Sequence, residues 1–322
     1  MTGTAAGGLR LLAGRVVQAV LVAMVVGAAS FLLVEALPGD QAYRFAAGRY
    51  GEDLVSTAAA EAVRAELGLD RPAFARFAAW LGDLARLDLG VSLVTGEPIL
   101  DELRLQLWAT IGLSLAALAV SILIGPPLGV WMALRAGRAV DTIGLGVAAG
   151  IRATPAFVIG LVLMLGLAGQ LGWLPAAGYD EPASWVLPTL TLAVGLAAVS
   201  GRVTRDAALA VLRSPHVAFA RTKGLSTPQV LRRHALRNTA APVVAYLGVQ
   251  LVTLIEGVVV VESLFAWPGI GHALVARDIP MVQGTALAMG LLFVALNAAV
   301  DVLCLAIDPR RVRAGTGRWG RA

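Results

Sequence analysis

Six long runs of this chain contain no Asp, Glu, Lys or Arg. Their lengths lie between 18 and 30 residues, and a helix needs about 20 mainly apolar residues to cross about 30 Å of hydrocarbon. The pattern therefore predicts an all-α membrane protein with six membrane-spanning helices. The runs cover residues 16–34, 105–134, 153–179, 182–201, 238–255 and 279–300.

Basic residues between the runs predict which ends of the helices face the cytoplasm, where flanking Lys and Arg are retained. With the N-terminus inside, the cytoplasmic segments carry 17 basic and 3 acidic residues, and the opposite segments carry 8 basic and 16 acidic residues. Both termini are therefore expected in the cytoplasm. The cytoplasmic segments are 1–15, 135–142, 202–237 and 308–322.

Four regions follow from this arrangement. Residues 1–34 form a cytoplasmic tail and the first span, 35–104 an external region, 105–307 a core of five helices, and 308–322 a second cytoplasmic tail. The external region is expected to begin with a turn at 36–40 and to contain a helix within 52–67.

A second external helix is expected after Asp70 as its cap, with Pro72 at its first position. Its apolar residues recur at helical spacing and are expected to pack over the mouth of the helix bundle. They are Phe74, Phe77, Trp80, Leu81 and Leu84.

Proline and tryptophan refine the predicted spans. Pro126-Pro127 and Thr154-Pro155 predict kinks rather than breaks, because neighbouring helices can satisfy the freed carbonyl groups. Three tryptophans are expected at the membrane interface, which amphipathic rings prefer: Trp173, Trp185 and Trp267.

The composition supports an integral membrane protein, with 58% hydrophobic residues, 15% charged residues and a mean hydropathy of +0.77. The net charge of +5 does not indicate a nucleic-acid partner, because the cytoplasmic bias of basic residues already explains it. A single cysteine, Cys304, excludes an intramolecular disulfide. Histidines 216, 234 and 272 are scattered, so no metal site is expected.

Catalytic motifs are absent from the sequence. The single lysine, Lys223, stands between Thr222 and Gly224, so the chain lacks the Gly-Lys-Ser/Thr of a phosphate-binding loop. Neither Gly-x-Ser-x-Gly nor His-Glu-x-x-His occurs. The chain is therefore expected to be no enzyme and to hold no cofactor.

The segment 201–238 carries eight basic residues against one acid between two apolar runs. Ser214 can cap a helix whose first residue is Pro215, and Gly224 can end it. Ser226 or Thr227 before Pro228 can begin another. The segment is therefore predicted to form helix, turn and helix in contact with a cytosolic partner.

Few ionisable groups lie within the predicted spans. A charge at the bilayer centre is costly, so Arg152, Glu256 and Asp301 are expected to face the bundle interior or a wet cavity. Arg152 either pairs with Glu256 or extends to the cytoplasmic surface. Glu262 lies at an outer boundary and, six residues from Glu256, on a different helix face. Asn297 shares a face with Asp301.

Seven motifs, in order along the chain, resemble the integral-membrane permease of a bacterial ABC importer, specifically the B-type permease of the dipeptide/oligopeptide/nickel family. The resemblance covers nearly the whole chain. The motifs are Leu37-Pro-Gly-Asp40, Leu87-Asp-Leu-Gly-Val-Ser92, Leu171-Gly-Trp-Leu-Pro175, Arg221-Thr-Lys-Gly-Leu225, Arg233-His-Ala-Leu-Arg237, Trp267-Pro-Gly-Ile-Gly271 and Asn297-Ala-Ala-Val-Asp301, which leads to Asp308-Pro-Arg310.

By this resemblance, 201–238 is the coupling loop, called the EAA loop, which docks in a cleft of a cytosolic ATPase. Ala218 stands at the namesake glutamate position and Arg237 at a position that is proline in the general pattern. The coupling residues that the resemblance implies are Ser214, Pro215, Ala218, Arg221, Thr222, Lys223, Gly224, Leu225, Arg233 and His234.

The resemblance also implies the partners and the location. These are a second homologous permease, two ABC ATPases or one fused ATPase that bind ATP and Mg, and an external substrate-binding protein, all at the bacterial inner membrane. Peptides are the expected substrate, with nickel, haem or glycans as alternatives. A different class of protein, an ion-coupled secondary transporter, would use Arg152, Glu256 and Asp301 as coupling charges.

Overall fold

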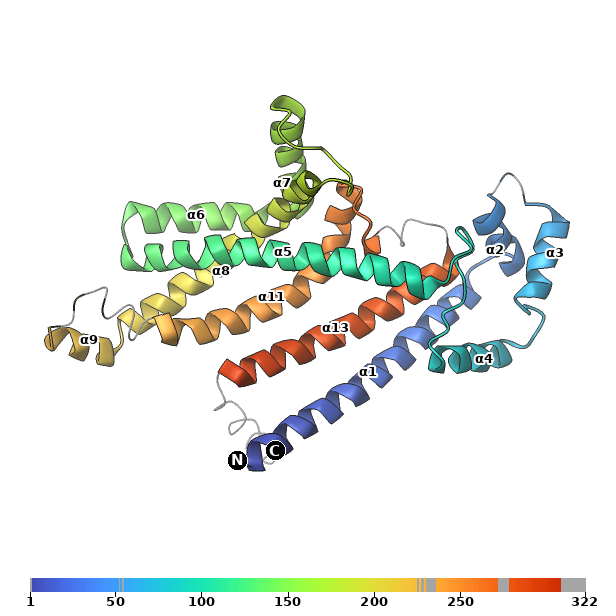
Figure 1. Ribbon diagram of the computed structural model, residues 1–322, viewed down its shortest axis with the longest axis horizontal. Helices are drawn as coiled ribbons and strands as arrows, with labels where there is room; N and C mark the ends of the chain where they lie inside the picture. Colours follow the sequence, from blue (N-terminus) through green and yellow to red (C-terminus); the bar gives the residue numbers. More distant parts are fainter. Residues whose placement is uncertain are drawn as a thin grey trace. The chain divides into compact units, whose positions relative to one another are not determined.

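The computed structural model describes residues 2–51, 53, 55–224, 226, 229, 236–271 and 278–307, and every regular element in these residues is helical (Figure 1). Contacts divide the chain into two compact units, 1–109 with 268–295 and 110–267 with 296–322. The described helices are α1 (Thr2–Ala36), α2 (Gln41–Tyr50), α3 (Thr57–Glu66), α4 (Ala73–Ala85), α5 (Ile99–Leu134), α6 (Ala139–Ala153), α7 (Ala156–Leu163), the π-helix η2 (Met164–Gln170), the 3₁₀-helix η3 (Pro182–Trp185), α8 (Val186–Leu212), α9 (Pro215–Thr222), α11 (Leu236–Leu264) and α13 (Ile279–Ile307).

Four described helices are long and apolar enough to cross a membrane, and the number rises to six if each of two bent pairs counts as one span. One bent pair joins α6 to α7 and η2 at 101°, and the other bends α11 by 60° between 242–252 and 257–264. The chain is thus a mostly helical, multi-pass protein. The four long helices cover Ala13–Ala36, Ile99–Leu134, Pro182–Leu212 and Ile279–Val302.

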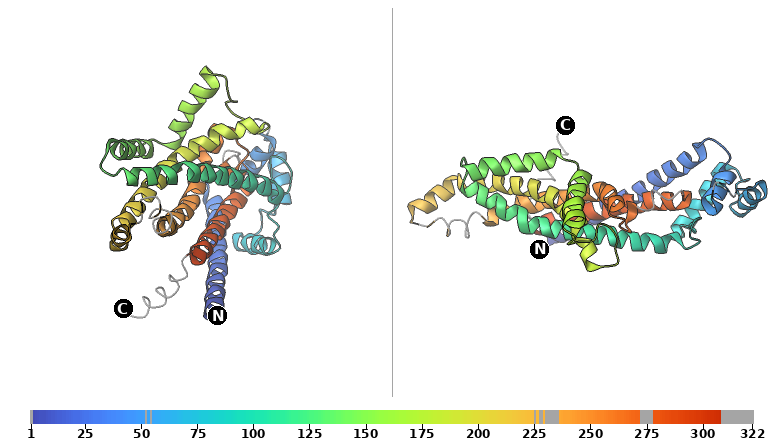
Figure 2. Two further views of the ribbon diagram at one scale, coloured as in Figure 1. Left: turned by 60° about the vertical axis from the view of Figure 1, so that its left-hand side comes forward. Right: turned by 90° about the horizontal axis from the view of Figure 1, so that it is seen from above.

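The predicted kink at Thr154-Pro155 is wrong, because the helix breaks there. α6 ends at Ala153, and α7 leaves at a sharp angle (Figure 2). Thr154 is extended (φ −90°, ψ 126°), since a following proline disfavours the helical conformation. Within the predicted span 153–179, the helix after this break therefore runs only from Ala156 to Gln170. Pro126 and Pro127, in contrast, remain inside the continuous α5, as predicted.

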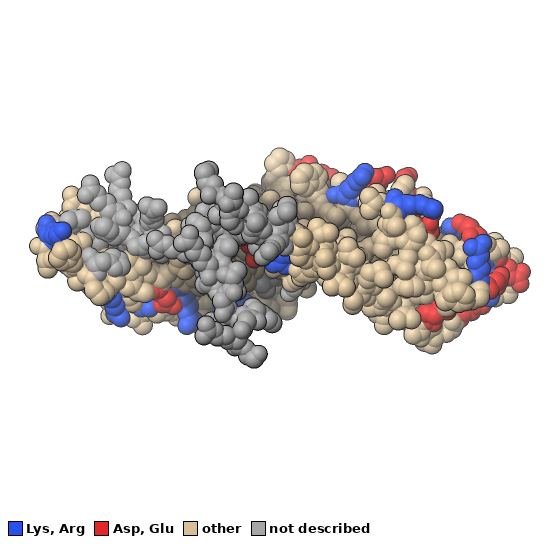
Figure 3. All heavy atoms as spheres, turned by 90° about the horizontal axis from the view of Figure 1, so that it is seen from below, with Lys and Arg blue, Asp and Glu red and all other residues tan. Residues whose placement is uncertain are grey.

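In the first unit, segment 35–104 begins with the predicted turn. The Asp40 carboxylate accepts a hydrogen bond from the Ala42 N–H (2.9 Å) and caps α2, which the sequence analysis did not predict. Ser56 caps α3 inside the predicted range 52–67. The Arg49 guanidinium binds both oxygens of Glu66 at 2.6 and 3.0 Å and lowers the pKa of that carboxyl. Charged side chains of both signs gather over α2–α4 (Figure 3).

α4 packs against α1 through the predicted apolar stripe. The Phe77 ring lies 5.2 Å from the Phe31 ring, and the Trp80 ring covers Gly27 of α1. Phe74 is 77% exposed. The predicted Asp70 cap is wrong: α4 begins after Pro72, whose carbonyl accepts the first hydrogen bonds.

α13 begins in this same unit at Ile279, directly after Asp278. The Asp278 carboxylate is buried and accepts hydrogen bonds from the Ser92 hydroxyl (2.6 Å), the Leu93 N–H (2.9 Å) and the Met281 N–H (3.2 Å). It therefore caps α13 and ties it to the loop before α5. α1 contacts α13 at Gly290. A Cβ atom on this glycine would lie 3.0 Å from the Val22 side chain of α1.

Candidate functional site

The corner between α8 and α9 lies in the second unit and has the predicted helix start. α9 begins at Pro215, which has no N–H to leave unpaired at this position. The Ser214 carbonyl accepts hydrogen bonds from the N–H groups of Val217 and Ala218 (both 3.1 Å). The Ser214 hydroxyl also donates to the Val211 carbonyl (2.5 Å), and this bond joins the corner to α8.

α9 has one buried and one exposed face. Val217 and Ala220 are buried against Val211, which holds the short helix at a fixed angle to α8. On the opposite face Phe219 is 61% exposed, and the Lys223 ammonium lies 4.6 Å from the centre of its ring. We name Phe219 and Lys223 the exposed corner pair.

Aromatic residues are enriched at protein interfaces, so the exposed Phe219 ring is a candidate contact for a partner. Lys223 belongs to the coupling residues predicted from the sequence, whereas Phe219 does not. The sequence feature that could have indicated Phe219 is its position as an isolated aromatic residue within the basic segment 201–238. Ala218 and Thr222 are exposed as well.

Gly224 follows α9 with φ at +84°, in the left-handed region that the sequence predicted. No atom lies within 4 Å of where a Cβ would stand, so the glycine is required by the backbone conformation rather than by space. The predicted second helix, with Leu225, Arg233 and His234, lies outside the described residues. The Arg221 side chain does too.

A buried ion pair, which the sequence analysis did not identify as a site, lies two turns before the end of α8. The Arg205 guanidinium donates from Nε and Nη2 to the two oxygens of Asp141 at 2.9 and 2.7 Å. The Gly137 N–H donates to the same carboxylate at 2.8 Å. The side chains of Asp141 and Arg205 are 4% and 17% exposed. The pair therefore fastens the turn between α5 and α6 to α8.

α5 crosses α8 at two glycines one turn apart. A Cβ at Gly125 would stand 2.1 Å from the Ser200 hydroxyl, and one at Gly129 would stand 2.2 Å from the Gly201 carbonyl oxygen. Small residues at this spacing let two membrane helices approach closely. Together with the ion pair, this crossing joins α5, α6 and α8 into one tightly packed group.

The candidate pathway residues belong to three helices, α6, α11 and α13. Arg152 is exposed in the last turn of α6. Its proposed pairing stays a prediction, because the side chain of Glu256 lies outside the described residues. Asn297 and Asp301 lie one turn apart on α13, and both are partly buried.

Glu262 is fully buried near the end of α11. The Thr110 hydroxyl of α5 donates to its carboxylate at 2.5 Å, and its backbone carbonyl accepts from the Trp267 N–H at 2.8 Å. The Trp267 ring meets the rings of Trp185 (4.6 Å) and Tyr179 (4.8 Å) edge-on. At 1% exposure Trp267 is a core residue, and its position at the membrane interface stays a prediction.

The described residues contain no group of three His, Cys, Asp or Glu side chains that could hold a metal ion. The second unit combines three features. They are the α8–α9 corner with its exposed residues, the Asp141–Arg205 ion pair, and the close contact of α5 with α8 at two glycines. They are parts suited to transmitting a movement within a membrane.

Two family models match the chain. The model described as "Binding-protein-dependent transport system inner membrane component" matches residues 125–313, and that of "Binding-prot-dependent transport system membrane comp, N-term" matches residues 8–114. A solved structure of the MetNI methionine ABC transporter in an inward-facing conformation has a TM-score of 0.56 at 18% identity, over 66% of this chain and 99% of that chain. The fold is thus shared with a type I importer permease.

Individual relatives are similar over most of their length. The chain is 38% identical over 283 residues to the "Glutathione transport system permease protein GsiC" of Pectobacterium atrosepticum, covering 87% of this chain and 91% of the relative. It is 38% identical over 312 residues to the "Putative peptide transport system permease protein" of Brucella abortus (strain 2308), covering 93% and 98%.

Fold and site together define a membrane-spanning transport subunit. The chain belongs to the family of binding-protein-dependent transport system inner membrane components, the permeases of ABC importers, within the peptide and glutathione group.

Proposed function

We propose that this chain forms half of a translocation pathway for di- or oligopeptides in the bacterial inner membrane. A second homologous permease supplies the other half, and an external binding protein delivers the substrate. Two cytosolic ATPases, separate or fused, bind ATP and Mg and drive the cycle. The observation that carries the proposal is the exposed corner pair on α9, which is held at a fixed angle by the buried contacts of Val217 and Ala220.

The corner suits a mechanical connection to an ATPase. Phe219 offers apolar area and Lys223 offers charge to an acidic or polar cleft. The α9 end of α8 is joined to the α5–α6 turn by Asp141 and Arg205. A displacement of α9 would therefore carry α5, α6 and α8 together, as alternating access requires.

Substrate class rests on the names of the relatives. One relative is described as a glutathione permease and another as a peptide permease, and glutathione is itself a tripeptide. A small peptide is the substrate class that both descriptions share. Membership in the ABC importer permease family also favours ATP-driven import over the alternative, an ion-coupled transporter that uses Arg152, Glu256 and Asp301.

The test is uptake by the reconstituted transporter. Proteoliposomes that contain this chain with its partner subunits should accumulate a radiolabelled tripeptide when ATP is enclosed on the ATPase side and binding protein is added. Omission of ATP or binding protein should abolish uptake. Uptake driven by a proton or sodium gradient without ATP would contradict the proposal, as would ATP hydrolysis by the isolated, contaminant-free chain.

A further inference from the structure

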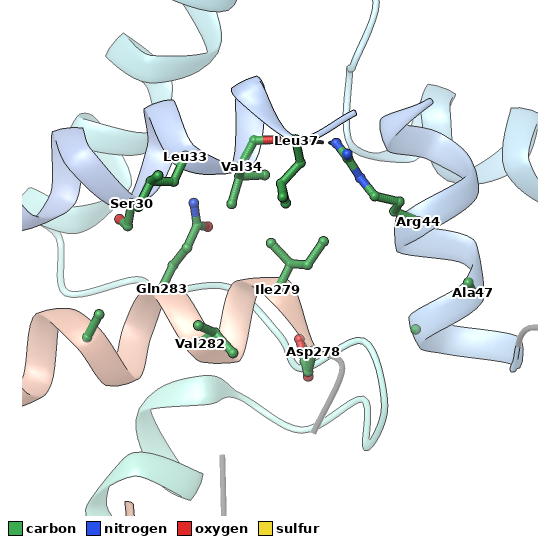
Figure 4. Close-up of a pocket in the computed structure, with 12 residues that line it drawn as sticks. Ser30, Leu33, Val34, Leu37, Arg44, Ala47, Asp278, Ile279, Val282 and Gln283 are labelled. Atoms are coloured by element: carbon green, nitrogen blue, oxygen red, sulfur yellow. Dashed lines mark hydrogen bonds between the residues drawn. The ribbon is translucent and has the colours of Figure 1, made fainter. Parts of the chain in front are cut away.

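A cavity of about 630 Å³ opens in the first unit between the end of α1, α2 and the start of α13 (Figure 4). Its walls are chiefly apolar side chains of the two long helices. The lining residues belong to the end of the candidate span 13–36 in α1 and to the start of the candidate span 279–302 in α13, so these walls lie at one end of both apolar spans. The apolar lining residues include Leu33, Val34, Leu37, Ile279, Val282 and Ala286.

One end of the cavity is polar and positively charged. Arg44 of α2 lines it just beyond the end of the α1 span. Its Nη1 and Nη2 donate to the carbonyls of Pro38 (2.8 Å) and Val34 (3.2 Å), which fix the guanidinium without neutralising it. Its Nε is buried and meets no acceptor in the described part of the chain.

No acidic side chain of the described residues balances Arg44. Asp278 lines the same cavity, but its carboxylate is already bound by the Ser92 hydroxyl and the Leu93 and Met281 N–H groups. The Gln283 side chain extends from α13 toward Ser30 and Val34 of α1 (Figure 4). The cavity therefore combines apolar walls, a neutral polar group and an uncompensated cation.

From this combination we propose that the cavity binds one anionic phospholipid. A phosphate at the membrane boundary meets the charge of Arg44, because guanidinium groups bind phosphate with charge-assisted hydrogen bonds. An acyl chain packs against the apolar part between α1 and α13, because apolar surface favours contact with hydrocarbon over contact with water. The lipid would stabilise the contact of α1 with α13, independently of the substrate carried.

Lipid composition tests the charge requirement. The full chain, purified with any partners that accompany it and placed in nanodiscs of equal phosphatidylglycerol and phosphatidylcholine, is examined by native mass spectrometry. The unaltered protein should retain phosphatidylglycerol selectively. Arg44→Gln should lower that retention about tenfold, the effect expected for one lost charge-assisted hydrogen bond.

The matched control is Arg86→Gln. It removes the same charge from the same segment at an 81% exposed position that does not line the cavity. Retention of phosphatidylglycerol should not change in this variant. Equal loss in both variants, or equal binding of both lipids by the unaltered protein, would overturn the proposal.

A second measurement does not depend on the folding of an Arg44 variant. A photoreactive amino acid placed at Val282, a partly buried residue of the cavity wall, should form a lipid adduct when irradiated in native membranes. Ala286→Leu, which narrows the cavity, should reduce this adduct. Capture of another protein subunit or of a second copy of this chain, in place of lipid, would show that the face is a protein interface and would refute the lipid site.

Discussion

Asp141 accepts two hydrogen bonds from the guanidinium of Arg205, 64 residues later in the chain. This buried pair fixes the α5–α6 turn on α8, close to the corner that carries α9. Loss of the Asp141 carboxylate removes these charge-assisted hydrogen bonds and leaves Arg205 with the exposed Asp206 as its remaining acidic partner, at a cost of about 1.5–3 kcal/mol.

Asp141→Asn should therefore lower the stability of the protein and reduce uptake. Thermal denaturation in detergent, followed by size-exclusion chromatography, measures the first effect, and ATP-dependent uptake measures the second. Asp206→Asn is the control, because Asp206 binds the same arginine at 2.8 Å but is 55% exposed. It should change stability by less than about 1 kcal/mol. Equal stability of all three proteins would contradict a structural role for the pair.

Gly224→Val should abolish uptake at an unchanged level of protein in the membrane. A β-branched residue in the left-handed conformation costs roughly 1–2 kcal/mol, so the chain after α9 would change direction. Gly224→Asn is the matched control, because asparagine tolerates this conformation and the site has free space. Near-normal uptake by the valine variant would remove the coupling role from this turn.

Phe219→Ala should weaken the association with the ATPase subunits without affecting folding, because the ring is exposed. The loss should reach about 2 kcal/mol if Phe219 is a central contact, measured by copurification and by the ATPase activity of the assembled complex. Phe74→Ala, at an equally exposed aromatic on α4, should leave association unchanged. If the two variants assemble equally well, α9 is not the docking element.

Gly129→Ala should destabilise the chain by about 1–3 kcal/mol, because the added methyl group would meet the Gly201 carbonyl oxygen and Thr204 at 2.2 and 2.8 Å. Gly146→Ala on α6 is its control, since nothing lies within 4 Å of the new methyl group there. That change should be neutral or stabilise the helix by up to about 1 kcal/mol. Thermal denaturation in detergent measures the stability of both variants. Equal melting temperatures of the two variants would contradict the close contact of α5 with α8 at Gly129.

The orientation predicted from the basic residues is tested by reporter fusions. Fusions after Arg138, after Ser214 and at the C-terminus should report a cytoplasmic location. Fusions at Asp70 and Asp180 should report an external one. An external report at Ser214 would place the exposed corner pair on the side without ATP and would exclude its coupling to cytosolic ATPases.

The sequence by itself determined the features that local chemistry controls. Stretches without charge predicted the long apolar helices, because a missing charge is a property of the residues themselves. Pro215 and Gly224 predicted where α9 starts and where the chain turns left-handed after it, since both act through their own backbone geometry. The ordered motifs identified the permease family, which the family models confirm.

Only the tertiary structure decided the features that depend on distant residues. Asp141 could not be matched with Arg205 from sequence, because nothing local selects one arginine among many. The burial of Trp267 under Tyr179 and Trp185 likewise joins residues that are far apart in the sequence. Thr154-Pro155 breaks its helix while Pro126-Pro127 does not. Local preference permits both results, and the packing of neighbouring helices selects between them.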